Sequence, residues 1–141
     1  MNPKPKCVSG SHFVDLDVFR RTLTVSLDTK YVYKVGFHID FTIENSTLIN
    51  KGKTVNFDGD YVILLDGELR IGISHYHLSE NAREVLSAGR ISIENGKVVS
   101  LDSWSGHYTP GIEDLADAVA FFKANGLTGT PFQAFYITFD Q

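Results

Sequence analysis

The residues best suited to chemistry lie in the run from Ser105 to Pro110, which reads Ser-Gly-His-Tyr-Thr-Pro. His107 is the first candidate, because an imidazole changes charge near neutral pH and can act as a general acid or base. Gly106, directly before it, permits a close approach of the backbone to a ligand. The same imidazole could instead hold a turn against a neighbouring strand by hydrogen bonds. Both interpretations stay open on the sequence alone.

Two further histidines, His75 and His77, follow an expected strand at Leu69–Ile73. If that strand continues, alternation puts both imidazoles on one face and Tyr76 on the other. With His107 they would number three, as in many catalytic zinc sites. Because the sequence has no His-Glu-x-x-His pattern, we expect no metal and no other cofactor. His75 and His107, acting as base and acid, would suit a metal-independent cleavage of a phosphodiester.

The groups around His107 would complete a ligand pocket. A helix is expected directly after the run, and unpaired N–H groups at a helix start favour anions. Trp104 could stack on a base or a sugar, or could anchor the core. A serine hydrolase is not expected, because the Gly-x-Ser-x-Gly elbow is incomplete around Ser105. The expected ligand-binding residues are Trp104, Ser105, Gly106, Tyr108 and Thr109.

Two local patterns would position this run of residues. Arg90–Glu94 and Lys97–Leu101 are β-like segments joined by Asn95-Gly96, the strongest two-residue hairpin pattern. A helix is expected from about Pro110 to Asn125, with Thr109 as its N-cap. The candidate residues would therefore lie where the last hairpin strand ends and the helix begins. The stripe of this helix expected to be buried is Ile112, Leu115, Ala116, Val119 and Phe122.

The remaining β-rich segments indicate a sheet. Alternation or apolar character predicts strands at Thr22–Leu27, Lys30–Glu44, Thr54–Phe57, Tyr61–Leu65, Leu69–Ile73 and Phe132–Phe139. Tyr61–Leu65 and Leu69–Ile73 are expected to form a second hairpin across Asp66-Gly67. Asn45–Gly52 is expected to be a connection, and Ser74–Ser87 a loop with at most one helical turn. The predicted fold class is α+β, a mostly antiparallel sheet that could partly close into a barrel, with one principal C-terminal helix packed on it. Residues 1–10 are expected to be a flexible tail and 11–141 a single globular domain.

The composition excludes several classes of protein. The chain has 141 residues, a formal net charge of −4 and a pI near 5.6, so it lacks the basic surface of a protein that coats DNA. The single cysteine, Cys7, excludes a disulfide framework. No apolar run approaches the length needed to span a bilayer, and the N-terminus does not resemble a signal peptide. We therefore expect a protein with no membrane partner, cytoplasmic or exported without a cleaved signal peptide.

Part of the chain resembles an uncharacterised domain family. The matching tracts are His75-Tyr76-His77-Leu78-Ser79, Val85-Leu86-Ser87-Ala88-Gly89, Asn95-Gly96 and Ser105-Gly106-His107-Tyr108-Thr109-Pro110. They are similar to the family pattern H-x-x-L-S, V-x-x-A-G, N-G and S-G-H-Y-x-P, which occurs in bacterial secreted, toxin-type proteins. The pattern also occurs in plant IQ-motif calmodulin-binding proteins, outside the calmodulin-binding segment. The resemblance covers about a quarter of the chain and implies a shared site built from His75, Ser105, His107 and Tyr108.

The chain departs from the family pattern at two places. Tyr76 stands where the family often has a small hydroxyl residue, and Glu80-Asn81 where it often has glycines. If those glycines let a ligand approach the backbone, this chain either binds differently or does not bind. The sequence shows no IQ motif, so the resemblance does not imply calmodulin binding.

Two functions from different classes follow from these observations. The first is a small effector- or toxin-like domain that binds a small anionic ligand, a nucleotide or RNA, in a pocket at the Ser105–Pro110 turn. The second is a non-catalytic protein-interaction module, such as an inhibitor or immunity-type partner, in which the same turn is a structural latch. Both histidines facing a common cavity would favour the first function, and a closed, packed turn would favour the second.

Overall fold

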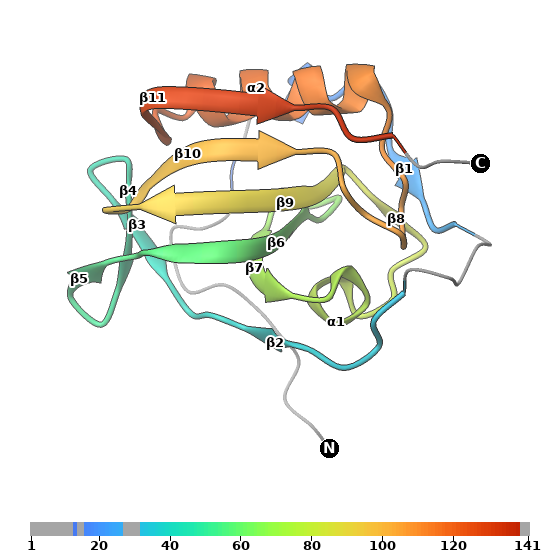
Figure 1. The fold of residues 1–141 in the computed structure, drawn as a ribbon, viewed down its shortest axis with the longest axis horizontal. Coiled ribbons are helices and arrows are strands. Elements are labelled where there is room, and N and C mark those ends of the chain that lie inside the picture. Colours follow the sequence, from blue (N-terminus) through green and yellow to red (C-terminus); the bar gives the residue numbers. More distant parts are fainter. Residues whose placement is uncertain (1–12, 14–15, 27–31, 139–141) are drawn as a thin grey trace.

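The centre of the computed structural model, which describes residues 13, 16–26 and 32–138, is a six-stranded sheet with the order β11-β10-β9-β6-β7-β2 (Figure 1). Its strands are β2 (Phe37–His38), β6 (Phe57–Ile63), β7 (Leu69–Ile73), β9 (Ser87–Glu94), β10 (Lys97–Asp102) and β11 (Thr128–Phe135). The smaller sheets are β1 (Leu23–Thr24) with β8 (Glu84–Val85), and β3 (Thr42–Glu44), β4 (Thr47–Asn50) and β5 (Lys53–Thr54). The helices are η1 (Leu16–Val18), α1 (His75–Ser79) and α2 (Ile112–Ala124). Residues 1–10, the expected tail, lie outside the described part.

Alternation along the central strands divides the core between the two faces of the sheet. Tyr61, Ile91 and Phe122 belong to the larger cluster, in which one face of the sheet packs against α2. Val62 and Ala88, one position removed along their strands, belong to a second cluster that includes residues of α1, β1 and β8. Successive strand side chains point to opposite faces, so the sheet is covered by α2 on one side and partly by α1 on the other.

Both predicted hairpins are confirmed. β9 and β10 pair antiparallel with Glu94 opposite Lys97, and the two turn residues Asn95 and Gly96 have φ values of 52° and 79°. These left-handed conformations are those that a type I′ turn requires, and Asn and Gly adopt them most readily. β6 and β7 pair in the same way, with Ile63 opposite Leu69.

The predicted fold class is confirmed as well. Among the described strands of the central sheet, the pairs β6–β7, β6–β9, β9–β10 and β2–β7 are antiparallel, and only β10–β11 is parallel, joined by a crossover through α2. In the described residues β11 and β2 lie at opposite edges of the sheet and do not pair with each other, so the sheet is open. The principal helix packs on this sheet near the C-terminal end, as expected.

The predicted start of the helix is wrong by two residues. Thr109 has φ 46°, which is left-handed and not the extended conformation of an N-cap. The N-cap is Gly111, whose backbone N–H donates to Asp114 Oδ2 at 2.7 Å. The carboxylate of the third helical residue therefore supplies the capping hydrogen bond, and no side chain of Thr109 is needed for it.

The predicted buried stripe of the helix is also partly wrong. Ile112 is 62% exposed and Ala116 is exposed, whereas Asp114 and Asp117 are buried. The buried residues of α2 are Asp114, Leu115, Asp117, Ala118, Phe121 and Phe122. The two carboxylates can be buried because arginines of the N-terminal segment pair with them: Arg21 Nε donates to Asp114 at 2.7 Å and Arg20 Nε to Asp117 at 3.0 Å.

The structure breaks the long strand predicted for Lys30–Glu44. Only β2 and β3 form within its described part, and Tyr33, Val35 and Phe37 are 68%, 89% and 51% exposed. The alternating side chains in the first half of this segment, predicted to be half-buried, thus lie on the surface. Further along, the prediction holds: Phe41 is 2% exposed, and Ile39 and Ile43 are partly buried against the core. The expected connection Asn45–Gly52 contains β4, because Asn45 and Ser46 adopt positive φ and form a tight turn.

Candidate functional site

The Ser105–Pro110 turn connects β10 to α2 and is closed. The Ser105 hydroxyl accepts a hydrogen bond from the Tyr108 backbone N–H at 3.1 Å, and the Ser105 carbonyl accepts one from Thr109 N–H at 2.9 Å. Ser105 has no exposed surface and Gly106 is buried. These hydrogen bonds are those of a serine turn. The Ser105 hydroxyl, which could have contacted a ligand, is therefore bonded to the backbone of its own turn.

The Tyr108 hydroxyl fastens this turn to α1 and to the segment that follows it. It donates to the Ala82 carbonyl oxygen at 2.5 Å and lies 2.8 Å from the Ser79 hydroxyl. Ser79 in turn donates to the His75 carbonyl oxygen at 2.7 Å. Burial raises the pKa of the Tyr108 phenol, with only 2% of the residue exposed. The phenol is therefore a neutral hydrogen-bonding group that joins three segments of the chain.

His75, the first residue of α1, is fixed against strand β9. Its Nε2 lies 2.7 Å from the carbonyl oxygen of Gly89, and because a carbonyl only accepts, Nε2 carries the proton. Burial lowers the pKa of His75, while Asp60 and the Gly89 carbonyl act in the opposite direction. The imidazole is thus held neutral, in one tautomer, by a contact within the chain.

His107 is enclosed by aromatic rings and has no such contact. Its ring centroid lies 5.5 Å from that of Tyr76 and 4.6 Å from that of Tyr108, both in edge-on geometry. Neither ring nitrogen has a hydrogen-bond partner among the described residues, and both are buried. Burial lowers the pKa of His107, and protonation of the nearby His75 would lower it further. An unpartnered buried polar group costs about 1–3 kcal/mol, so this imidazole is a local weakness of the fold.

The remaining candidates lie at the rim of the turn. Trp104 is half-buried beneath Arg90, whose guanidinium carbon is 5.6 Å from the ring centroid, and its backbone N–H donates to Asp102 Oδ1 at 2.9 Å. Thr109 is exposed. The structure therefore brings His75, His107 and Tyr108 together in one packed layer, and it places Trp104 and Thr109 outside that layer.

His77 does not join His75. The chain is helical from His75 onward, so residues two apart point in different directions, and the predicted common strand face is wrong. His77 contacts His38 of β2 instead, with 3.2 Å between His77 Nε2 and His38 Nδ1. In the part of the chain that the structure describes, no group of three or more His, Cys, Asp or Glu side chains is placed to hold a metal ion.

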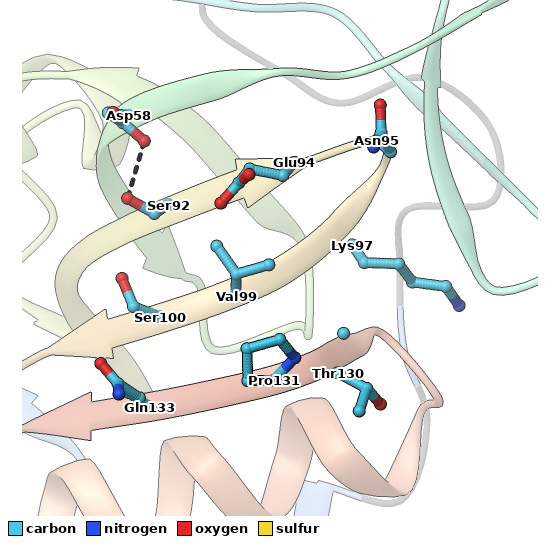
Figure 2. A pocket seen from close by; sticks show the side chains of 11 residues that line it. Asp58, Ser92, Glu94, Asn95, Lys97, Val99, Ser100, Thr130, Pro131 and Gln133 are labelled. Carbon is cyan, nitrogen blue, oxygen red and sulfur yellow. Dashed lines mark hydrogen bonds between the residues drawn. The ribbon is translucent and has the colours of Figure 1, made fainter.

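A polar groove, which the sequence reasoning missed, lies on the face of the sheet opposite α2 (Figure 2). Its larger part has a volume of about 600 Å³ and crosses β6, β9, β10 and β11. The side chains most relevant to binding are Asp58, Ser92, Glu94, Ser100 and Gln133. The adjoining part, about 350 Å³, shares Asp58, Ser92 and Ser100 and ends at Arg90 and Asp102. We call both parts together the open-face groove.

The larger part of the open-face groove has more negative than positive side chains available for binding. Ser92 donates to Asp58 at 2.7 Å, and Arg90 pairs with Asp102 at 2.8 Å. Lys97 extends away from the other side chains, and its Nζ donates to the carbonyl oxygens of Ser46 and Gly126 (Figure 2). Asp58 and Glu94 therefore give the larger part of the groove a negative character.

The alternation of β9 was the sequence pattern that could have predicted this groove. Ile91 and Ile93 point into the core, while Arg90, Ser92 and Glu94 face the other way. A row of polar residues on such a face is ordinary for a solvated strand, so the concavity itself is visible only after the strands are paired.

No family model, curated protein or solved structure matches the chain. Among the described residues, none of the helices is long and apolar enough to cross a membrane.

Proposed function

We propose that the protein is a non-catalytic protein-interaction module in which the Ser105–Pro110 turn is a structural latch and the open-face groove is the binding surface. The observation that carries this proposal is that the Tyr108 hydroxyl is hydrogen-bonded within the chain, to Ala82 and Ser79. A group that must act on a substrate needs to reach it, whereas these groups are turned to neighbouring backbone.

The same contacts explain what the latch supports. Tyr108 holds α1 through Ser79, and His75 at the start of α1 bonds to Gly89 of β9. Gly89 lies against Asp102 of β10, where a Cβ would be 2.1 Å from the Asp102 carbonyl oxygen. Arg90 and Asp102 then form one end of the groove. The latch thus fixes the strands that carry the binding surface, which supports a scaffold role.

The groove favours a polar, basic segment of a protein partner. Its larger part exposes Asp58 and Glu94, while Lys97 is engaged elsewhere. Hydroxyl and amide groups at Ser100 and Gln133 can exchange hydrogen bonds with a peptide backbone. As an inhibitor or immunity-type module, the protein would bind a partner with lysine or arginine side chains at its contact surface, since complementary charge gives specificity.

The test uses two tryptophan substitutions on opposite faces of the molecule. Ser100→Trp fills the groove, and Ala120→Trp adds the same side chain to the exposed side of α2. Partners captured by the wild-type chain are purified, and their affinity is measured by calorimetry with both variants. Binding lost in Ser100→Trp and kept in Ala120→Trp supports the proposal. Equal binding by both variants contradicts it.

A second candidate function is the toxin-like domain with a nucleotide or RNA pocket, and one observation favours it. The two ring nitrogens of His107 have no partner among the described residues, and polar ligand groups could satisfy them after a movement of the turn. Stabilisation of the wild-type chain by nucleotide or RNA, together with its loss in His107→Ala, would favour this candidate. Cleavage of RNA that requires His107 and His75 would establish it as catalytic.

A further inference from the structure

Two histidines on separate elements face each other at the edge of the sheet. His38 ends β2, and His77 lies in α1. Their rings are nearly parallel, with an angle of 21° and a centroid separation of 5.4 Å. The distance from His38 Nδ1 to His77 Nε2 is 3.2 Å, so one ring donates its proton to the other. The Ser105–Pro110 turn and the open-face groove do not include either residue.

The spacing of these nitrogens suits a shared metal ion. A histidine nitrogen binds zinc at about 2.0–2.1 Å, so two such ligands with tetrahedral or right-angled geometry lie roughly 3–3.4 Å apart. We propose that His38 Nδ1 and His77 Nε2 bind one divalent transition-metal ion, such as Zn²⁺, Ni²⁺ or Cu²⁺, with water completing the coordination. Imidazole ligands suit these ions.

Replacement of the His38–His77 hydrogen bond by a bound metal ion needs no co-reactant. Each ligating nitrogen gives its lone pair to the metal. The imidazole whose N–H bridged the pair takes the tautomer that has the proton on its other ring nitrogen. No net proton is released when both rings begin neutral.

The surroundings of the two histidines indicate a site that an ion can enter from solvent and that binds it with moderate affinity. The His38 side chain is 27% exposed, so an ion can enter from solvent. Asp40 Oδ1 lies 3.9 Å from His38 Nε2, the nitrogen that points away from His77; this distance is beyond a direct hydrogen bond, so the carboxylate contributes only its negative charge near the site. Glu80 beside His77 is paired with Arg70 at 2.8 Å. Since the described residues supply two ligands and no group of three, the site binds more weakly than a structural zinc site.

A bound ion would connect β2 to α1. β2 pairs only with β7 among the described strands, through Phe37 opposite Ile73 and His38 opposite Gly72. An added link from this short edge strand to the helix would raise the melting temperature, because a ligand that binds only the folded state stabilises it.

The experiment titrates Zn²⁺ and Ni²⁺ into the full chain by calorimetry, with any affinity tag removed. A Cys7→Ser, His12→Ala background removes the cysteine and the histidine that lie outside the described residues. We expect one ion per chain and a higher melting temperature. His38→Gln and His77→Gln should each weaken binding by at least about tenfold, since even groups behind a ligand contribute that much. Lys34→Gln, an exposed change in the same segment, should leave binding unchanged.

Circular dichroism shows whether each variant is folded, and the imidazole NMR signals of the parent chain identify the ligands independently. Shifts of the His38 and His77 ring signals with Zn²⁺, at constant His75 and His107 signals, support the proposal. Absence of binding heat up to millimolar metal overturns it. Binding that persists in the His38→Gln, His77→Gln double variant overturns it as well.

Discussion

Replacement of His107 by phenylalanine should stabilise the protein. The wild-type imidazole has one donor and one acceptor, both buried and without a partner among the described residues. Removal of such groups recovers about 1–3 kcal/mol. The slightly larger phenyl ring keeps the edge-on contacts with Tyr76 and Tyr108, at a packing cost that can reach about 1 kcal/mol or more. The net expectation at pH 7.5 is a gain of about 1 kcal/mol in the free energy of unfolding.

The gain should increase at acidic pH. Burial and His75 hold the pKa of folded His107 below 6.5, so the unfolded chain takes up this proton at higher pH than the folded protein. The stability is therefore complete above pH 6.5 and falls as the pH decreases toward the folded pKa. One such group contributes a slope of about 1.4 kcal/mol per pH unit in that window. The His107→Phe variant should lose this part of the slope.

Urea denaturation followed by the fluorescence of Trp104 measures both effects, at pH 7.5 and in steps down to pH 5.5. His75→Phe is the matched control with the opposite expectation. It removes the donor to the Gly89 carbonyl and should destabilise the protein by about 1–3 kcal/mol. The reasoning is refuted if His107→Phe is clearly less stable than wild type at pH 7.5, or if its pH slope equals that of wild type.

Three further changes test other parts of the structure. Tyr108→Phe removes the bond to Ala82 and should lower the free energy of unfolding by about 1–2 kcal/mol in urea, whereas an unchanged value would contradict the latch. Asp114→Ala removes the cap on Gly111 and the contact with Arg21, and should cost about 1 kcal/mol at pH 7. Because these partners lower the pKa of Asp114, that difference should vanish when the pH falls below the folded pKa, which acid titration by circular dichroism would show. Gly96→Ala should lower the melting temperature, since φ is +79° and the new Cβ would lie 2.3 Å from Thr47 Cγ2.

Local patterns predicted the parts of the fold that local chemistry determines. The Asn95-Gly96 turn and the β6–β7 hairpin depend on residues adjacent in sequence, and both were predicted from them. The buried face of α2 was not predicted correctly, because Asp114 and Asp117 are buried through pairing with arginines more than ninety residues away in the sequence. A carboxylate at an exposed position of a helical pattern gives no indication of such a partner.

The candidate site shows the same limit. The sequence identified the Ser105–Pro110 turn as a place where polar groups gather, and the structure shows most of those groups bonded to neighbouring backbone. Whether His75 and His107 act on a ligand stays a prediction. The open-face groove depends on the pairing of four strands, and the contact between His38 and His77 joins elements 39 residues apart. Neither could be read from a local pattern.

The most direct test of the closed latch is an NMR titration of the histidine rings with and without nucleotide or RNA. The closed turn predicts that the His107 ring titrates below pH 6.5 and that its signals stay constant when nucleotide or RNA is added at pH 7.5. A His107 ring that titrates at or above pH 6.5 and shifts on addition of nucleotide would contradict the closed latch and would place a ligand at this turn.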